Sequence, residues 1–214
     1  MLTGFDAMLA AHAKVLGRGA QIVLTVTDSV AAFVTLPWQH ALSRKNELDA
    51  YARSCFECQG VLLDATSLMQ HDFRRFGETG VAYALPRHLI DALATIVARH
   101  GMTLSSVLPI SAVVYTRYRK PRGAGVSIAL LREAQRCSAL VFDRSGLIEH
   151  AIEPVTVSRV ESAQRLLVRI ASVHPVGRVD EWTSSVQPDT DVAGAVHAAT
   201  PQTTYKLISR EAWS

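Results

Sequence analysis

The 214-residue chain has few cysteines and few charges, and both shortages exclude classes of protein. Its three cysteines, Cys55, Cys58 and Cys137, are an odd number, which is a poor basis for a disulfide framework and indicates a reducing compartment, the cytoplasm. Charged residues make up only 19%, and the formal net charge is +3. This charge does not argue for a nucleic acid as the partner.

Long apolar runs are also missing. No run approaches the ~20 residues that a helix needs to cross a bilayer. The first residues include Asp6 and lack the continuous apolar stretch of a signal peptide. We therefore expect no membrane span, and we expect any attachment to a membrane to go through a partner. The 49% of hydrophobic residues is enough to bury one large core or two small lobes.

The hydrophobic periodicity of the first half predicts an α/β fold. Residues 1–20 have the spacing of an amphipathic helix, and residues 21–36 alternate like a β-hairpin that turns at Asp28. Ser43 is placed to cap the helix that follows. Residues 61–76 fit neither period and are expected to be irregular, with at most one short strand.

A cleaner pattern follows Gly80, where strands and helices alternate. Residues 81–85 and 104–108 are predicted strands. Pro86 opens a predicted helix after the first strand, and residues 110–120 form a predicted helix after the second. This order predicts a parallel pair of strands joined by a right-handed crossover. Together with the hairpin, it predicts a mixed sheet flanked by helices.

The second half begins with a predicted antiparallel meander of residues 126–132, 137–143 and 147–155. Ser158 and Glu161 then have capping-box spacing before one more amphipathic helix.

These patterns divide the chain into four parts. They are an N-terminal helix (1–20), a first lobe (21–122), a partial second lobe (123–180) and a loosely ordered tail (181–214), in which Thr, Ser, Ala and Gln outnumber apolar residues.

Motifs for catalysis, phosphate binding and metal binding are absent or incomplete. The chain has no G-x-S-x-G elbow, and residues 122–125 fit neither a P-loop nor a glycine-rich phosphate turn. Cys55 and Cys58 form a C-x-x-C pair, but they lie at the end of a predicted helix, whereas redox pairs use a helix N-terminus and zinc needs further ligands. We therefore assign no catalytic, cofactor-binding or metal-binding residue, and we predict that the protein is not an enzyme.

The densest basic run comprises Arg117, Arg119, Lys120 and Arg122, with two tyrosines interleaved. Such a run could dock an acidic peptide, lipid headgroups or a nucleic acid, and we name these four residues as the partner-binding candidate. The alternative is that they only complement the dipole at a helix C-terminus.

The predicted order of elements resembles the RNase H-like half of actin-type proteins. Residues 34–38 (Val-Thr-Leu-Pro-Trp), with the helix that contains residues 48–51, resemble the early part of the actin-like cytoplasmic proteins of type IV pilus and type II secretion assembly, the PilM and GspL type. Residues 81–86 and 104–109 resemble the segment of that family in which two strands each end in proline. The resemblance spans residues 21–173.

The departures from this family concern nucleotide binding. Nucleotide-binding members carry an Asp-x-Gly loop in the first turn of each half, whereas residues 27–30 and 132–136 contain no glycine, and Glu133 would repel a phosphate. The second half is also expected to stop after one helix. The resemblance therefore implies a degenerate actin-like scaffold whose second lobe is truncated, a pseudo-ATPase without a cofactor.

Three functions follow from the resemblance and its departures. The first is a non-catalytic protein-binding scaffold of a bacterial type IV pilus or type II secretion-like assembly, cytoplasmic and recruited by an inner-membrane partner, with a second copy of the chain as a further partner. The second is a nucleotide-binding actin-like ATPase. The third is a nucleic-acid-binding RNase H-like module, which lacks the clustered carboxylates of two-metal nucleases.

The C-x-x-C pair generates the first prediction. We expect Cys55 and Cys58 to stay reduced and to bind no metal, because a helix C-terminus neither lowers a thiol pKa nor adds ligands. Elemental analysis of the purified protein should find no zinc above the level in a C55S/C58S variant. Stoichiometric zinc that disappears in the variant would show that the prediction is wrong.

Overall fold

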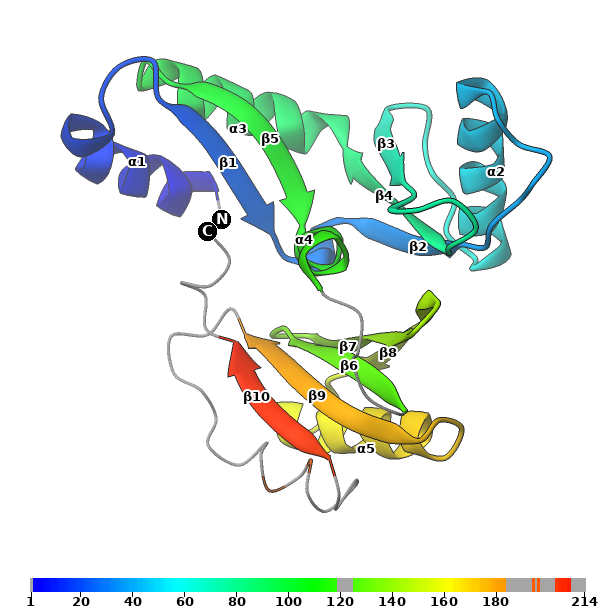
Figure 1. Ribbon diagram of the computed structural model, residues 1–214. Coiled ribbons are helices and arrows are strands. Elements are labelled where there is room, and N and C mark those ends of the chain that lie inside the picture. The colour runs from blue at the N-terminus through cyan, green and yellow to red at the C-terminus, as the bar shows by residue number, and fades with distance from the viewer. Residues whose placement is uncertain (1, 119–124, 184–193, 195, 197–202, 209–214) are drawn as a thin grey trace.

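The computed structural model describes residues 2–118, 125–183, 194, 196 and 203–208. The chain forms two lobes, one above the other in Figure 1, with α4 between them. The first lobe contains α1 (Leu2–Leu16), β1 (Gln21–Val26), the 3-10 turn η1 (Asp28–Val30), β2 (Ala32–Leu36), α2 (Lys45–Cys58), β3 (Ser67–Asp72), β4 (Gly80–Pro86), α3 (Arg87–Arg99) and β5 (Thr103–Pro109). After α4 (Ile110–Arg117), the second lobe contains β6 (Val126–Arg132), β7 (Arg136–Asp143), β8 (Gly146–Pro154), α5 (Arg159–Ala171), β9 (Val176–Thr183) and β10 (Thr204–Ile208).

The first lobe has two separate sheets. One is the parallel pair of β1 and β5, on which α1 and α3 pack. The other is an antiparallel sheet of order β2-β4-β3, whose face is covered by α2 through Ala52 and Phe56. In Figure 1 the first sheet lies on the left of this lobe and the second on the right.

This arrangement corrects two expectations about strand pairing. The predicted hairpin of residues 21–36 does not form, because η1 sends β1 and β2 into different sheets. The predicted parallel pair of β4 and β5 does not form either. Both edges of β4 are taken, by β2 on one side and by β3 on the other, so β5 pairs with β1 instead. β3 lies in the segment for which the sequence indicated at most one short strand.

The start of α2 also differs from the expectation that Ser43 caps it. The N-cap is Arg44, and the Glu47 carboxylate accepts hydrogen bonds from the backbone N–H groups of Ser43 and Arg44 at 3.3 and 3.1 Å. A carboxylate in the first turn satisfies these free donors and also complements the helix dipole, so it outcompetes the serine hydroxyl.

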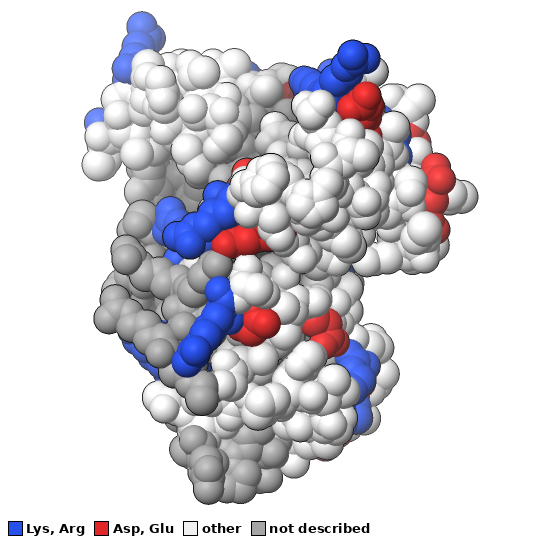
Figure 2. All heavy atoms as spheres, turned by 45° about the vertical axis from the view of Figure 1, so that its right-hand side comes forward, with Lys and Arg blue, Asp and Glu red and all other residues white. Residues whose placement is uncertain are grey.

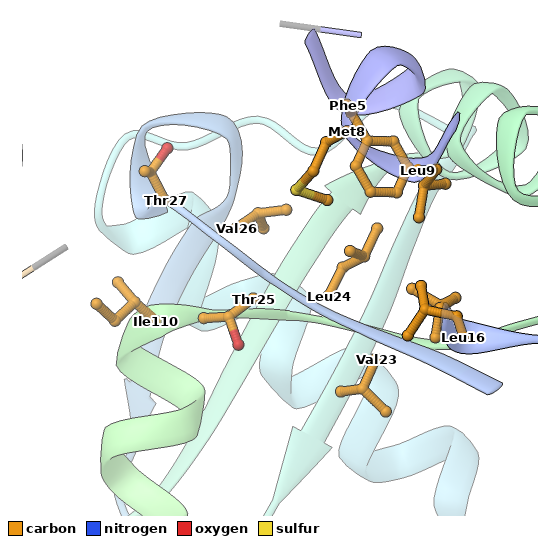
Figure 3. A pocket seen from close by; sticks show the side chains of 11 residues that line it. Phe5, Met8, Leu9, Leu16, Val23, Leu24, Thr25, Val26, Thr27 and Ile110 are labelled. Carbon is orange, nitrogen blue, oxygen red and sulfur yellow. The ribbon is translucent and has the colours of Figure 1, made fainter. Parts of the chain in front are cut away.

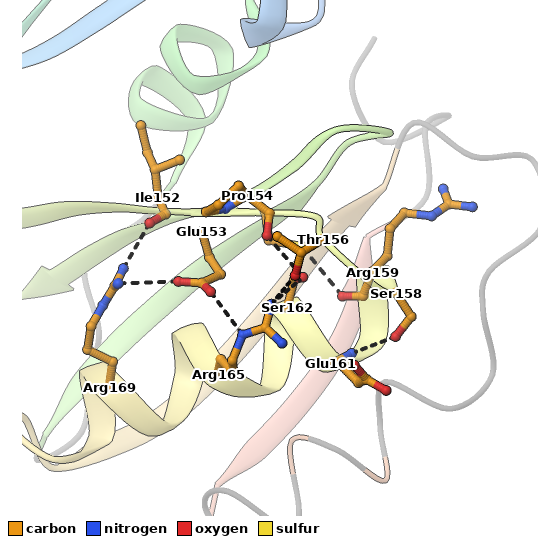
Figure 4. A network of polar contacts seen from close by, with 11 residues as sticks. Ile152, Glu153, Pro154, Thr156, Ser158, Arg159, Glu161, Ser162, Arg165 and Arg169 are labelled. Atoms are coloured by element: carbon orange, nitrogen blue, oxygen red, sulfur yellow. Dashed lines mark hydrogen bonds and ion pairs between the residues drawn. The ribbon is translucent and has the colours of Figure 1, made fainter.

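The second lobe is built on one mixed five-stranded sheet of order β10-β9-β6-β7-β8. The predicted meander of β6, β7 and β8 is confirmed. Ser158 caps α5 as expected by accepting a hydrogen bond from the Glu161 N–H at 3.1 Å. Figure 4 shows how α5 is held to β8, where Glu153 accepts from Arg165 at 2.9 Å and from Arg169 at 3.3 Å.

This lobe continues beyond the point where the sequence predicted it to stop. β9 and β10 add two parallel strands next to β6, so the described parts of residues 181–214 include strands of this sheet. The polar composition concealed β9, whose charges pair inside the lobe. Arg132 on β6 donates to Glu181 on β9 at 2.6 Å, and Tyr205 on β10 donates to the same carboxylate. The rest of the predicted tail lies outside the described residues.

One apolar core joins the two lobes. Phe33, Tyr83 and Leu85 from the first lobe share a buried cluster with Leu140 and Trp182 from the second. Every residue of α4 from 110 to 115 is buried, so this helix lies inside the junction. The buried helix and the shared cluster therefore hold the two lobes together. No described helix is long and apolar enough to cross a membrane.

Candidate functional site

The candidate site lies where three chain segments meet between the lobes. η1 follows β1, the first turn of α4 follows β5, and the turn between β6 and β7 belongs to the second lobe. Pro109 ends β5 and is the N-cap of α4, since proline suits the start of a helix. The three segments bring together Asp28, Ser111, Glu133 and Arg136, which are far apart in the sequence.

Asp28 is the centre of this cluster, with only 1% of its surface exposed. Its carboxylate accepts a hydrogen bond from the Ser111 N–H at 3.1 Å and another from the Ser111 hydroxyl. These bonds attach the turn after β1 to the N-terminus of α4. A helix N-terminus favours a negative charge, so the placement is electrostatically matched.

Glu133 reaches across from the second lobe and is also buried, with 3% exposed. Its Oε1 atom accepts a hydrogen bond from the Asp28 N–H at 2.7 Å, and its Oε2 atom accepts from Arg136 Nε at 3.0 Å. Arg136 Nη2 also lies 3.8 Å from the Asp28 carboxylate. The arginine thus balances two buried carboxylates that belong to different lobes.

The burial of Asp28 changes its proton affinity. The pKa of this carboxyl is raised to about 6, mainly by burial and to a smaller extent by the charge of Glu133, while the hydrogen bonds from Ser111 and the charge of Arg136 act in the opposite direction. Burial dominates because a charge in a low-dielectric region loses its hydration.

The geometry determines what this junction can do chemically. A loop that binds phosphate directs backbone N–H groups at the anion, but here the Asp28 N–H donates to Glu133. A protein carboxylate thus takes the hydrogen bond that an anionic ligand would need. The hydrogen bond from the Asp28 N–H to Glu133 therefore joins the two lobes.

Comparison with known proteins identifies the fold. No protein-family model and no curated protein matches the chain. Among solved structures, PilM in the PilM–PilN type IV pilus biogenesis complex is similar over 95% of this chain and 74% of its own, at 8% identity and a TM-score of 0.58. A protein of unknown function from Bacteroides thetaiotaomicron with an actin-like ATPase fold is similar over 89% of this chain and 68% of its own, at 6% identity and a TM-score of 0.57. The chain has an actin-like fold.

A third similar structure is the cytoplasmic domain of EpsL, an inner-membrane component of the type II secretion system of Vibrio cholerae. It covers 94% of this chain and 82% of its own, at 12% identity and a TM-score of 0.50. The resemblance to PilM and GspL-type proteins that the sequence indicated is thus confirmed at the level of the fold. The actin-like structure also brings together residues 27–30 and 132–136, the two turns that the sequence analysis compared with phosphate loops.

The predicted partner-binding run is described only in part. Arg117 is exposed at the end of α4, while Arg119, Lys120 and Arg122 lie outside the described residues. On the face shown in Figure 2, several basic side chains of the described residues lie beside acidic ones, and uncharged surface separates the blue groups from one another. The role of the run in partner binding stays a prediction.

The two cysteines of the C-x-x-C pair lie in the last turn of α2, as expected. Cys58 is exposed and Cys55 is half-buried, and burial raises the pKa of the Cys55 thiol. Among the residues that the structure describes, no group of three or more His, Cys, Asp or Glu side chains is placed to hold a metal ion. Whether the pair binds zinc stays a prediction.

Sequence reasoning found part of the junction. It singled out Glu133 by its charge and its glycine-free turn, but it missed the pairing of Asp28 with Ser111 and the role of Arg136. A signal was present in Ser111, two residues after Pro109, because a small polar residue in the first turn of a helix can bind a carboxylate from a neighbouring turn.

The raised pKa of Asp28 generates a prediction about stability and pH. The folded-state value of about 6 lies above the usual 3.8, so protonated Asp28 favours the folded state. Its contribution is fully present below pH ~4 and is lost as pH rises through ~6, a change of ~3 kcal/mol in the free energy of unfolding. Asp28→Asn keeps neutral groups that can bond Ser111. We expect this variant to exceed the wild type in stability above pH 6 and to match it near pH 4.

Urea unfolding of both proteins from pH 4 to pH 8 measures this difference. Asp64→Asn is the matched control, because Asp64 is exposed and hydrogen bonds from Ser67 and Thr66 lower its pKa. It should show no gain at neutral pH. A difference between wild type and Asp28→Asn that does not change with pH would contradict the prediction.

Proposed function

We propose that this chain is a non-catalytic, protein-binding scaffold of a bacterial pilus or type II secretion-like assembly. The observation that carries the proposal is the hydrogen bond between the Asp28 N–H and Glu133, at the junction where the two glycine-free turns meet. Its physical consequence is that the lobes are tied by the protein's own carboxylate. An actin-like protein built in this way can present surfaces to partners without a nucleotide cycle.

Electrostatics support the non-catalytic role. A nucleoside triphosphate needs backbone donors and cations around its phosphates, whereas the described junction contributes the carboxyl groups of Asp28 and Glu133 with Arg136 bound between them. Displacing Glu133 from the Asp28 N–H would break its buried ion pair with Arg136, which costs several kcal/mol. The binding of an anion would have to overcome this cost.

The solved relatives suggest the kind of partner. PilM is found in a complex with PilN, and the EpsL domain belongs to an inner-membrane component of a secretion system. We therefore propose that an inner-membrane assembly protein recruits this chain to the cytoplasmic face of the membrane. The basic run at the end of α4 is the candidate for contact with that partner or with acidic headgroups.

The first test addresses nucleotide binding. A ligand at a hundred times its dissociation constant stabilises a folded protein by about 2.7 kcal/mol, so millimolar Mg-ATP should raise the melting temperature of a true binder. We expect no shift for this protein, because Glu133 takes the Asp28 N–H. Magnesium with inorganic phosphate at the same ionic strength is the control. A specific rise of several degrees with Mg-ATP would favour the alternative of an actin-like ATPase.

The second test addresses recruitment. Arg117→Glu, Arg119→Glu and Lys120→Glu together should abolish co-purification with the membrane fraction or the inner-membrane partner, since each basic residue near an anionic surface contributes about 1 kcal/mol. Circular dichroism should show an unchanged fold, because Arg117 is exposed.

The matched control reverses three other exposed basic residues, Lys45, Arg53 and Arg87, which lie on α2 and α3. Equal loss of recruitment in both triple variants would show a general charge effect. Unchanged recruitment in the first variant would show that the basic run only complements the dipole at the C-terminus of a helix.

A further inference from the structure

The first lobe exposes an aromatic cluster at one end of its antiparallel sheet, made of Trp38, Phe73 and Phe76. Trp38 follows β2, and the two phenylalanines lie in the connection between β3 and β4. The centroid of the Trp38 ring lies 5.4 Å from that of Phe73 and 4.7 Å from that of Phe76, with both pairs edge-to-face. Phe73 packs against the core beneath α2, whereas Phe76 is 81% exposed. The outermost ring of the cluster is therefore in solvent.

The connection that carries Phe76 is fixed to the end of α4. The buried Tyr115 of this helix donates its hydroxyl to the Thr79 carbonyl at 3.1 Å and accepts from the Arg74 N–H at 3.3 Å. Arg74 Nη1 donates in turn to the carbonyl groups of Tyr115 and Tyr118 at 3.0 and 2.7 Å. Carbonyl groups at the end of a helix lack partners within the helix. These bonds hold both ends of the connection, so Phe76 is exposed by a segment that is itself anchored.

Positive charge accompanies the aromatic cluster. Arg75 directly precedes Phe76 and is exposed. Arg117 is also exposed, and it lies in the last turn of α4 between the two residues whose carbonyl groups bind Arg74. The hydrogen bonds of Arg74 thus bring the last turn of α4 and the aromatic connection together, although the two are distant in the sequence.

The carboxylates of the same connection lie on other surfaces. Asp72 precedes Phe73, and successive side chains of a strand point to opposite faces of a sheet. Burial raises the pKa of Tyr83, and the charge of Asp72 adds to this effect, which places Asp72 near the face that packs into the lobe junction. Glu78 is half-buried beside Gly146 of the second lobe. Neither carboxylate follows Phe73 onto the α2 side of the sheet.

The start of α2 does not reverse this charge. Its two carboxylates are engaged: Glu47 accepts hydrogen bonds from backbone N–H groups at the start of the helix, and Asp49 lies 3.1 Å from His71 Nε2 on β3. Arg44 and Lys45, at the same helix end, are both exposed and balance them. The arginines of the aromatic connection and of α4 therefore leave a positive balance beside the cluster.

The protrusion of Phe76 indicates what kind of surface covers it. Exposed apolar patches mark contacts with proteins or membranes. A protein would need a pocket deep enough to bury this ring, with carboxylates placed around it. An anionic bilayer offers an apolar interior and negative headgroups to any protruding ring. A ring that is 81% exposed, next to exposed arginines, fits the bilayer.

We propose that the aromatic cluster docks on an anionic membrane surface, with the Phe76 ring between headgroups and acyl chains and with Arg75 and Arg117 at the lipid phosphates. One apolar anchor alone gives weak, reversible attachment, and basic residues supply the second signal that stable attachment needs. That a membrane is within reach rests on the proposed scaffold function. The lipid contact goes beyond that function, in which a protein partner recruits the chain.

A second apolar region provides a comparison. Figure 3 shows the groove between α1 and β1, with Phe5 and Met8 on one side and the length of β1 along the other. Met8 is 47% exposed, but no residue that lines this groove carries a charge. The groove therefore has only one of the two signals, and we expect it to add nothing to the binding of anionic vesicles.

The test uses the purified full chain and vesicles of defined lipids, so that no protein partner is present. One set of vesicles is phosphatidylcholine, and the other is a 7:3 mixture of phosphatidylcholine and phosphatidylglycerol. We expect the protein to co-sediment with the anionic vesicles and to bind the neutral ones at least tenfold more weakly. Added sodium chloride should weaken binding, because salt screens exposed charges.

Two variants separate the apolar and the basic contributions. Phe76→Ser should weaken binding to anionic vesicles at least tenfold, and circular dichroism should show an unchanged fold because the ring is exposed. Arg75→Glu with Arg117→Glu should abolish binding, since both cations become charges of the same sign as the headgroups. Phe76→Trp keeps a ring at this position. It should bind like the wild type, and brominated acyl chains should quench its added fluorescence.

Matched controls change similar residues elsewhere. Met8→Ser removes an exposed apolar side chain from the uncharged groove, and Arg53→Glu with Arg87→Glu reverses two exposed arginines on α2 and α3. Both should bind anionic vesicles within about twofold of the wild type. An equal loss of binding in these controls would show non-specific adsorption and overturn the proposal.

The proposal also fails if the wild type does not bind anionic vesicles, if it binds neutral vesicles equally well, or if Phe76→Ser binds like the wild type. Recruitment by a protein partner has its own measurement. In a detergent extract, where no bilayer remains, Phe76→Ser should still co-purify with the inner-membrane partner. Absent lipid binding with intact co-purification overturns the lipid contact alone, whereas a wild type that binds vesicles but captures no partner overturns the scaffold function.

Discussion

The buried carboxylate of Asp28 ties the turn after β1 to the N-terminus of α4, while the backbone N–H of the same residue binds Glu133 in the second lobe. Three segments from both lobes thus converge on one residue. The turn that Asp28 begins also separates β1 from β2 and so divides the first lobe into two sheets. Because a buried carboxyl group requires partners, the hydrogen bonds from Ser111 and the charge of Arg136 add directional contacts to the apolar packing between the lobes.

The two lobes use the same unit and complete it differently. In each lobe a helix leads into a strand that pairs in parallel with a later strand, but only the second lobe has the described meander on the remaining edge. The second lobe is closed further by Arg132, Glu181 and Tyr205, which link three neighbouring strands. Among the described residues of the first lobe, no strand lies against the corresponding edge of β1.

The same contacts underlie the proposal that this chain is not a nucleotide switch. A switch needs a cleft that closes on its ligand and opens again. Here the Asp28 N–H donates a hydrogen bond to Glu133 of the same chain between the two lobes, and a shared apolar core lies beside this bond. For the proposed scaffold, such a body would offer preformed binding surfaces, so partners would meet little cost of reorganisation.

The sequence by itself determined the elements whose signal is local. The meander and the capped helix after it follow from alternation and from Ser158, and Glu133 was identifiable because a charge in a glycine-free turn is visible without a structure. The tertiary structure alone decided which strands pair. The local sequence pattern of β5 would suit pairing with either β4 or β1, and β5 pairs with β1 because β2 and β3 already occupy both edges of β4. The tertiary structure also determines that β9 is an inner strand of the sheet, since Asp180 and Glu181 are polar in the sequence and buried in the fold. The partners of Glu181, Arg132 and Tyr205, come from distant segments, and no local periodicity encodes a contact of that kind.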